Sequence, residues 1–340
     1  MQILIIDPPY EGEPDLEREA AGPEFAVDVW RIARQGPVPE ARFRAADALV
    51  NCRSSSSITA AEVALLDRCR IVSQSSVGFN HVDIEACAER GIPVCNVPDY
   101  GTMEVADHAV GLTLALVRGI VAYDRKLRDR RMGWNAREQG TVRRIFGTRF
   151  GVIGLGRIGL AAAFRAQAFG VEIAFYDPYL PAGIERALGF ERTASLEALL
   201  SNVDVVSIHT PLTDETREMI DAAALAHVKP GLILINTARG PIVDLDAVQD
   251  ALRTGQLGGV GLDVVPVEPL TYDHPLIEAW AADEPWLDGR MIVTPHAAFF
   301  SPDGVRDMRR IAITNVLDYV HHGRLRSCVN QGLLRANRPS

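Results

Sequence analysis

Short apolar runs rich in β-branched residues alternate with helical patterns along nearly all of the 340 residues. A strand needs a long crossover, usually a helix, to reach a parallel neighbour, so this alternation is typical of parallel βαβ units. It predicts an α/β protein with doubly wound parallel sheets. The expected strands are 2–7, 25–30, 48–52, 71–75 and 92–97 in a first series, and 150–154, 171–177, 203–209, 232–236, 259–264 and 291–294 in a second.

One long helical pattern, 103–132, separates the two series. Its first half is apolar and its second half is dense in Arg and Asp. Two consecutive series predict two α/β domains, which a chain of this length accommodates. We expect the helical pattern after Pro98 to be the crossing between them. A final helical pattern, 303–322, would return to the first domain and make that domain discontinuous.

The charge balance excludes the classes that need a basic surface. The chain has 44 acidic and 35 basic residues, a formal net charge of −9, so we expect no nucleic-acid partner. The basic run 125–131 includes Asp129 and is interpreted as a solvated or interface helix.

Cysteine usage and hydropathy indicate a soluble cytoplasmic protein. No two cysteines form a C-x-x-C pair, so neither a disulfide framework nor a metal site is predicted. No basic leader precedes Asp7. The longest apolar stretch, 105–117, is interrupted by Asp107 and His108 and is too short to span a bilayer, so no membrane partner is expected. The five cysteines are Cys52, Cys69, Cys87, Cys95 and Cys328.

A glycine-rich loop is the strongest local signal. The segment Gly154-Leu155-Gly156-Arg157-Ile158-Gly159 follows an expected strand and opens a helical run. In such a loop Gly154 allows the tight turn, Gly156 lets the backbone approach a pyrophosphate, and Gly159 lets helix and strand pack closely. The phosphates would sit at the helix N-terminus, where free N–H groups favour negative charge. The loop predicts a Rossmann-like dinucleotide site; the alternative is a βα turn without a ligand.

Asp177 bears on the choice of cofactor. It ends the next expected strand, 18 residues beyond Gly159, which suits a carboxylate that bonds the adenosine ribose. A carboxylate would repel the 2′-phosphate of NADP, and Pro178 and Tyr179 add no cation, so NAD is favoured. Arg157 keeps the other choice open, because it has the reach to meet a phosphate.

Three further segments each follow a strand and carry one reactive side chain: Arg239 in 236–240, Glu268 in 262–269 and His296 in 294–298. Strand C-termini line the ligand crevice of a doubly wound sheet. A guanidinium can hold a carboxylate, an imidazole can exchange a proton near neutral pH, and a carboxylate can fix the imidazole tautomer. These types suit hydride chemistry on a 2-hydroxy or 2-keto acid. His209 is interpreted as a strand-end residue and His108 as a packing residue.

With these motifs, and with 77–83 and 91–98, the chain resembles the NAD-dependent D-isomer-specific 2-hydroxyacid dehydrogenase family over nearly its whole length. Within that family, segments 175–180, 184–189 and 294–299 are similar to the C-terminal-binding-protein branch.

The resemblance implies a role for each matching residue. Arg239 would bind the substrate carboxylate and C2 oxygen, His296 would be the general acid and base, and Glu268 would pair with His296. The backbone of Val77 and Gly78 would hold the substrate carboxylate from the other domain. Residues implied around the cofactor are Thr210, Pro211, Thr237 and Asp263.

The resemblance also implies an architecture. Residues 99–297 would form the NAD-binding domain with the dimerisation helix, and 1–98 with 298–340 the substrate domain. The implied assembly is a homodimer.

Some points remain open at this stage. Phe299 stands where the corepressors carry a tryptophan. Arg53 follows a strand end and would either meet a second acidic group of the substrate or not contact it. The long, acidic and irregular stretch 268–296 is either a surface insertion or part of the substrate pocket.

Two functions compete. The first is NAD-dependent oxidoreduction of a small 2-hydroxy or 2-keto acid with an aromatic, branched or anionic side group. The second is an NAD-sensing dimeric scaffold of the corepressor type with little turnover. The chain has no long disordered tail, so the enzyme is expected. The length argues against a phosphoglycerate dehydrogenase that carries a regulatory domain.

Overall fold

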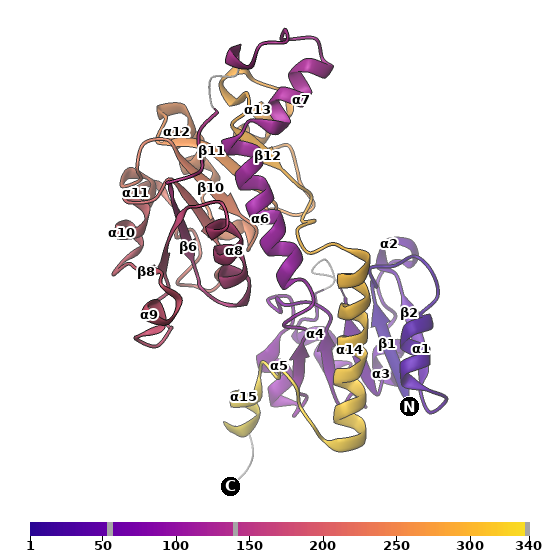
Figure 1. Cartoon of the computed structure of the whole chain (residues 1–340). Helices are drawn as coiled ribbons and strands as arrows, with labels where there is room; N and C mark the ends of the chain where they lie inside the picture. The colour runs from indigo at the N-terminus through magenta and orange to yellow at the C-terminus, as the bar shows by residue number, and fades with distance from the viewer. Residues whose placement is uncertain (53–56, 139–141, 337–340) are drawn as a thin grey trace. The chain divides into compact units, whose positions relative to one another are not determined.

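The computed structural model describes residues 1–52, 57–138 and 142–336 (Figure 1). The chain divides into two compact units. The first is made of Met1–Tyr100 and Ser301–Ser340, and the second of Gly101–Phe300. Each unit is built on a parallel sheet, as the strand–helix alternation predicts, so the expected α/β class is confirmed.

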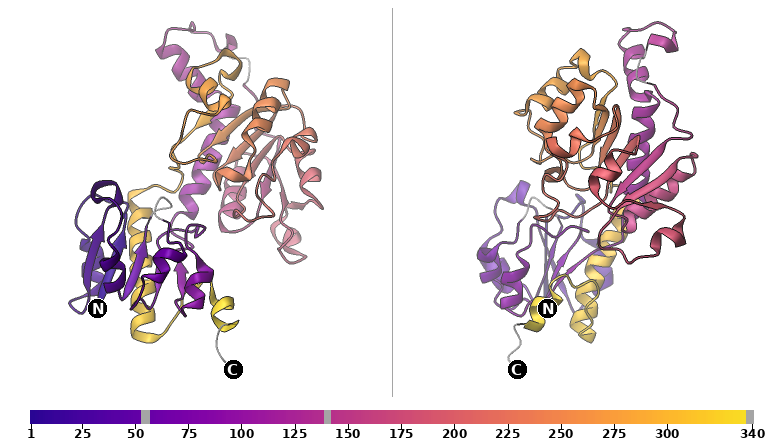
Figure 2. Two further views of the ribbon diagram at one scale, coloured as in Figure 1. Left: turned by 180° about the vertical axis from the view of Figure 1, so that it is seen from behind. Right: turned by 90° about the vertical axis from the view of Figure 1, so that its left-hand side faces the viewer.

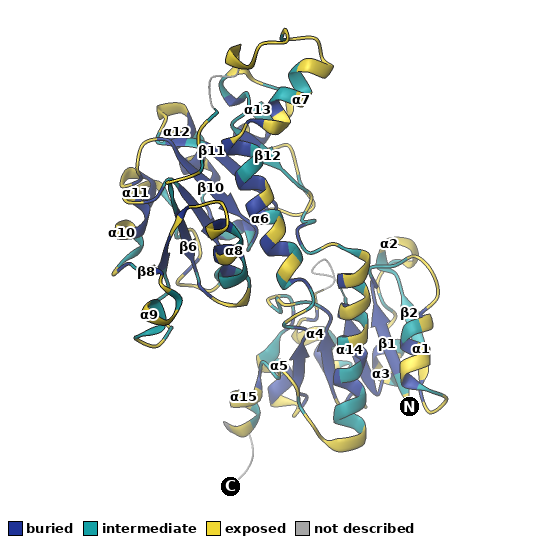
Figure 3. Cartoon of the chain, in the orientation of Figure 1, coloured by how far each residue is buried: buried dark blue, intermediate teal, exposed yellow. Residues whose placement is uncertain are grey.

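The sheet of the first unit has the order β2-β1-β3-β4-β5. Nearly every residue of β1, β3, β4 and β5 is buried, because helices cover both faces (Figure 3). Side chains of α3, α4 and α5 pack on one face, and those of α1 and α14 on the other. The strands are Gln2–Ile6, Ala26–Trp30, Ala48–Asn51, Val72–Gln74 and Val94–Asn96. The helices are α1 Asp15–Ala21, α2 Ile32–Gln35, α3 Glu40–Ala45, α4 Ala60–Ala64, α5 Ile84–Glu89, α14 Pro302–His322 and α15 Gln331–Ala336.

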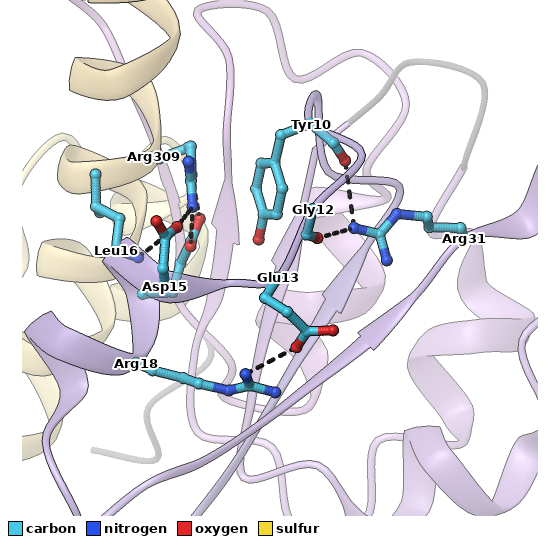
Figure 4. A network of polar contacts seen from close by, with 9 residues as sticks. Tyr10, Gly12, Glu13, Asp15, Leu16, Arg18, Arg31 and Arg309 are labelled. Carbon is cyan, nitrogen blue, oxygen red and sulfur yellow. Dashed lines mark hydrogen bonds and ion pairs between the residues drawn. The ribbon is translucent and has the colours of Figure 1, made fainter.

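Helix α14 belongs to the first unit although it comes after the whole second unit in the chain. Its Arg309 donates to both carboxylate oxygens of the buried Glu17, at 2.8 and 2.6 Å, and to Asp15 at 2.9 Å. The Arg309 guanidinium also lies 3.8 Å from the centre of the Tyr10 ring, beside the loop after β1 (Figure 4). This network attaches α14 to α1 and to the loop before it.

The second unit has a sheet of order β12-β11-β10-β9-β6-β7-β8. The chain starts at β6, runs outward to β8, and returns to extend the other half from β9, so the order reverses between β6 and β9. Helices α6 and α8 pack on one face (Figures 1 and 2), and α10, α11 and α12 on the other. A ligand crevice is expected outside the carboxyl ends of the strands at such a reversal.

The elements of the second unit are these. The strands are β6 Arg149–Ile153, β7 Glu172–Tyr176, β8 Glu191–Arg192, β9 Val205–Ile208, β10 Leu232–Asn236, β11 Leu257–Leu262 and β12 Met291–Val293. The helices are α6 Thr102–Val117, α7 Ile120–Arg128, α8 Arg157–Gln167, α9 Ile184–Leu188, α10 Leu196–Leu200, α11 Ala222–Ala226, α12 Leu245–Thr254 and α13 Pro275–Ala281, with 3₁₀ turns Ala136–Glu138, Gly240–Ile242 and Pro285–Leu287.

The single long helix expected over 103–132 is wrong. The chain forms α6 and α7, which are bent by 61° where Gly119 takes a left-handed φ of 64°. Among the described residues no single helix is long and apolar enough to cross a membrane; only this bent pair, taken together, passes that test by length and composition. The described residues also include no group of three His, Cys, Asp or Glu side chains placed to hold a metal.

The stretch between Glu268 and His296 is more ordered than expected. It contains α13, whose Leu276 and Ile277 are buried in the core of the second unit. Trp280 and Trp286 pack against the same core. The stretch is therefore a folded part of this unit rather than an irregular segment.

Replacing Arg309 by Met should destabilise the first unit. The Glu17 side chain is only 5% exposed, and the substitution removes the arginine that bonds both of its carboxylate oxygens. Loss of one partner of a buried pair costs about 3 kcal/mol or more in the free energy of unfolding, which urea unfolding followed by circular dichroism measures. The control is Arg306→Met on the same helix, where the arginine is exposed and, within the described residues, forms an ion pair with the exposed Asp303. Equal losses in the two variants would contradict the role of the network.

Candidate active site

In the loop after β6, Gly154 and Gly159 stand where a side chain would not fit. Gly154 has a φ of +84°, and a Cβ there would lie 3.0 Å from backbone atoms of His209 and Thr210. A Cβ on Gly159 would lie 2.1 Å from the carbonyl oxygen of Gly154, so only glycine lets α8 begin this close to the strand. Gly156 differs, because a Cβ there would point into open space. The N-terminus of α8 is thus open to a ligand at Gly156.

Asp177 stands directly after β7, next to this loop. Its Oδ2 accepts the Leu155 N–H at 2.9 Å and its Oδ1 accepts the Tyr179 N–H at 3.0 Å. The carboxylate is therefore held in place by the backbone, and each oxygen keeps a lone pair for a ribose hydroxyl. Arg157 is the first residue of α8 and is exposed.

The loop after β9 lies next to the glycine loop, because β9 and β6 are neighbours in the sheet. Thr210 and Pro211 follow His209, whose Nε2 lies 2.9 Å from the Ser207 hydroxyl. Burial lowers the pKa of His209 to about 4, so its ring is neutral near pH 7. His209 directly follows the last residue of β9. Thr237, after β10, is also buried, and within the described part of the chain its hydroxyl has no hydrogen-bond partner.

These features fit a dinucleotide. An exposed helix N-terminus at a glycine without obstruction suits a pyrophosphate, and a fixed carboxylate at the end of the next strand suits a ribose. A buried hydroxyl without a partner, as at Thr237, is a group that a bound ligand would satisfy.

His296 and Glu268 form an ion pair after β12 and β11. The distance from Nδ1 of His296 to Oε2 of Glu268 is 2.7 Å, and the two side chains are 37% and 32% exposed. Burial raises the pKa of the Glu268 carboxyl, but the hydrogen bond and charge of His296, the Val265 N–H and the charge of Arg239 outweigh it. That pKa therefore lies below its ordinary value, and the carboxylate is charged near neutral pH.

Asp263 holds the backbone that carries His296. Its buried carboxylate accepts the Ala297 N–H at 2.8 Å, the Ala298 N–H at 3.0 Å and the Thr294 hydroxyl at 2.6 Å. The His296 N–H donates to the Asp263 carbonyl at 2.8 Å, and His296 adopts a left-handed φ of 52°. A contact of Asp263 with the cofactor stays a prediction. The hydrogen bonds of the Asp263 carboxylate fix the conformation of the loop 294–298.

His108 was expected only to pack within the long helix, and the structure gives it a polar contact. Its Nε2 lies 2.9 Å from the Thr294 hydroxyl and 3.6 Å from Oδ1 of Asp263. The Thr294 hydroxyl donates to Asp263, so it accepts from His108. Helix α6 thereby supports the loop of His296. The available signal was a polar residue within an otherwise largely apolar helical stretch.

Arg239 follows β10 and is half-buried. Its guanidinium donates to the Ala238 carbonyl at 2.6 Å, and its charge acts on Glu268. The buried side chain of Asn236 fixes this turn, because it donates to the Arg239 carbonyl at 2.9 Å and accepts the Ala238 N–H at 3.0 Å. Sequence analysis assigned no role to Asn236, although a polar residue ending an apolar strand marks such a position.

The remaining expected residues fall in different places. Phe299 lies in the second unit, with its ring edge-on to His296 at 6.1 Å between centroids. Val77 and Gly78 belong to the first unit, where their carbonyls accept from the Asn96 amide and the Ser76 hydroxyl, both at 2.7 Å. Arg53 lies outside the described residues.

Strand order explains which residues come together. Arg239, Glu268 and His296 follow β10, β11 and β12, which are neighbours at one end of the sheet. The glycine loop, Asp177 and Thr210 follow β6, β7 and β9, the next three strands. All of these strands are parallel, so both groups lie at the same edge.

Comparison with known proteins agrees with this arrangement. Residues 110–298 match the family description "D-isomer specific 2-hydroxyacid dehydrogenase, NAD binding domain". D-3-phosphoglycerate dehydrogenase of Mycobacterium tuberculosis is 40% identical over 259 residues, 76% of this chain and 45% of that protein. Glyoxylate reductase of Korarchaeum cryptofilum is 33% identical over 319 residues, 93% of this chain and 92% of that protein.

Among solved structures, D-lactate dehydrogenase from Aquifex aeolicus, complexed with NAD and lactic acid, superposes with a TM-score of 0.82. It is 27% identical and covers 99% of this chain and 100% of its own.

The chain spans about half the length of the phosphoglycerate dehydrogenases it matches. The relatives named above are dehydrogenases and a reductase, so they do not support the expected nearness to the C-terminal-binding-protein branch. The family itself is supported by a match to more than half of the chain and by a relative that the chain covers almost entirely. The chain therefore belongs to the D-isomer specific 2-hydroxyacid dehydrogenase family.

Proposed function

We propose that the chain is an NAD-dependent oxidoreductase that transfers a hydride between NAD(H) and a small 2-hydroxy or 2-keto acid of the D series. The observation that carries the proposal is the His296–Glu268 pair, 2.7 Å apart, with the charge of Arg239 acting on it. The three side chains follow adjacent strands of the sheet that also presents the glycine loop. A proton-exchanging group and an anion-binding group beside a dinucleotide site suit this reaction.

His296 would move the proton. With Nδ1 bonded to Glu268, Nε2 is the ring nitrogen that exchanges a proton with the oxygen on C2 of the substrate. It gives this proton in reduction and takes it in oxidation. Glu268 would fix the ring orientation through its bond to Nδ1, and its lowered pKa keeps its carboxylate charged near neutral pH.

Arg239 would hold the substrate carboxylate and polarise the C2 oxygen with its guanidinium. The cofactor would be held by the glycine loop at its pyrophosphate and by Asp177 at its adenosine ribose, with Thr210, Pro211, Thr237 and Asp263 around the rest. When bound, the nicotinamide supplies or accepts the hydride. Electrostatic help from Arg239 matters most as negative charge develops on the C2 oxygen.

The first unit would be the substrate domain and the second the NAD-binding domain. Backbone groups of Val77 and Gly78 would meet the substrate carboxylate, and Arg53 and Phe299 would border its side group. The homodimer is proposed from α6 and α7, which expose apolar side chains as an interface helix pair does. Met103 is 58%, Ile120 56% and Val121 48% exposed.

Replacing Asp177 by Ala should relax the preference for NADH over NADPH. The substitution removes the carboxylate that would bond the ribose hydroxyls and repel a 2′-phosphate. The measurement is binding of each cofactor by fluorescence titration, with Asp250→Ala, an exposed carboxylate on α12, as the control. Equal affinity of the wild type for both cofactors would remove the basis for the assignment.

Replacing Glu268 by Gln should move the alkaline limb of the reduction profile to lower pH. Reduction requires protonated His296, and the variant lacks the negative charge that favours this form. Because the pKa of Glu268 lies below its ordinary value, its carboxylate is charged near neutral pH and above. The measurement is kcat/KM against pH. Glu278→Gln, exposed on α13, is the control; an unmoved limb in Glu268→Gln would assign the proton to another group.

Replacing Arg239 by Lys should lower kcat/KM at least about 10-fold. Lysine cannot reproduce the guanidinium fork, and hydrogen bonds to a charged group are worth about 1.5–3 kcal/mol. The measurement is oxidation of NADH at 340 nm with a panel of 2-keto acids, with Arg186→Lys, exposed on α9, as the control.

NADH binding and the dimer mass by sedimentation should be the same in Arg239→Lys and the wild type. Full activity of the variant would refute the site. A wild type that binds NADH and dimerises but turns over no keto acid would overturn the enzyme and leave the scaffold.

A further inference from the structure

Cys95 and Cys328 lie directly opposite each other in the first unit, although the whole second unit separates them in sequence. Cys95 is in β5, and Cys328 follows α14 and forms an isolated antiparallel bridge with it. The bridge is flanked by two backbone bonds, Asn96 N–H to the Ser327 carbonyl at 3.2 Å and Val329 N–H to the Val94 carbonyl at 2.8 Å. Since the bonds run between the flanking residues, the two cysteines form a non-hydrogen-bonded pair.

That pairing has the geometry of a disulfide site. Opposite residues in a non-hydrogen-bonded antiparallel pair have Cα atoms about 4.5 Å apart and side chains on the same face. A disulfide accepts Cα separations of roughly 4.4–6.8 Å. The antiparallel bridge already places the two residues opposite each other, so neither backbone needs a large movement to join them.

The surroundings hold this geometry. The buried Asn330, two residues after Cys328, accepts the Val94 N–H at 2.9 Å and donates to the Ile92 carbonyl at 3.0 Å. These bonds tie the C-terminal segment to β5 on the side of Cys328 opposite to Ser327. The register of the two cysteines is therefore fixed from both sides.

The two thiols have different access and different acidity. Cys95 is fully buried, whereas Cys328 is half-buried beside the exposed Ser327. The bond from the Cys95 thiol lowers the pKa of Cys328, and that bond together with burial raises the pKa of Cys95. The more acidic thiol is thus the more accessible one, which is the order required for a reactive and a resolving cysteine.

The other three cysteines lack this arrangement. Burial raises the pKa of Cys52, Cys69 and Cys87 to about 12 in each case, so their thiols stay protonated. Cys69 and Cys87 both belong to the apolar core beneath α4 and α5. The Cys69 thiol donates a hydrogen bond to the Ile71 carbonyl at 3.2 Å. They serve as an internal comparison within the same unit.

We propose that Cys95 and Cys328 are a redox site at which hydrogen peroxide forms a reversible intramolecular disulfide. The Cys328 thiolate attacks one peroxide oxygen, the O–O bond breaks, and a sulfenic acid and hydroxide result. The Cys95 sulfur then displaces the sulfenic hydroxyl, the S–S bond forms, and the departing hydroxide takes up the Cys95 proton. Two thiols and one peroxide give one disulfide and two waters.

The bond would attach the segment that contains α15 covalently to the last strand of the first sheet. It closes a loop that includes the whole second unit, so it removes many conformations from the unfolded chain. We expect the oxidised protein to melt at a temperature at least about 3 °C higher than the reduced protein.

Peptide mapping of the full chain tests the site. Each of the five cysteines lies on its own tryptic peptide, with Cys95 on 91–118 and Cys328 on 327–335. The native protein is treated with peroxide, alkylated and digested without reductant. The expected product is a cross-link between 91–118 and 327–335 that dithiothreitol reverses, with the other three cysteines alkylated. Alkylated Cys95 in the oxidised wild type, or a cross-link to another peptide, would overturn the proposal.

One variant tests the order of the two steps, and a second variant is its control. In Cys95→Ala, the sulfenic acid on Cys328 should persist and react with dimedone, and peroxide should no longer raise the melting temperature. In Cys69→Ala, the matched control, the cross-link should form as in the wild type. Loss of the cross-link in Cys69→Ala with retention in Cys95→Ala would assign the disulfide to a different pair.

Discussion

The buried carboxylate of Asp263 is the interaction on which the candidate site depends. A buried charge is costly unless several donors satisfy it. All three donors to Asp263 come from the loop after the neighbouring strand, through Thr294, Ala297 and Ala298. To deliver them, this loop must turn inward at the edge of the sheet, and that turn places His296 in a left-handed conformation. The position of the imidazole is therefore set by a buried carboxylate on the neighbouring strand end.

The parts of the site that the sequence predicts best are those in which chain order and spatial order coincide. The glycine loop and Asp177 lie within one βαβ unit, and the close approach of Gly159 to Gly154 is a local constraint that only glycine meets. Arg239, Glu268 and His296 are far apart in sequence but each follows a strand, so a parallel sheet brings them to one edge without any further information. The pairing of Glu268 with His296 could be predicted only with the help of the family resemblance.

The features that sequence analysis missed depend on contacts between distant elements. His108 lies in a helix that is apolar on most of its surface, and its bond to Thr294 spans 186 residues. The bend at Gly119 comes from a backbone conformation that the helical pattern of 103–132 does not reveal. The cysteine pair also required the register between β5 and the C-terminal segment, which no local pattern encodes. Arg53 and the backbone of Val77 and Gly78 remain predictions, because their roles depend on the substrate.

The position of α14 has a consequence for how the protein is made. This helix completes one face of the first sheet: Ser73 donates to the Ala312 carbonyl at 2.9 Å, and Asn315 donates to the Asn96 carbonyl at 3.0 Å. A ribosome synthesises the strands of that sheet well before α14, which follows the whole second unit in the chain. The second unit, which is contiguous, can fold as soon as its own residues have emerged. The first unit must wait, with an apolar face uncovered, until α14 has emerged. The strands made earliest are thus the ones most in need of protection from aggregation in the cell.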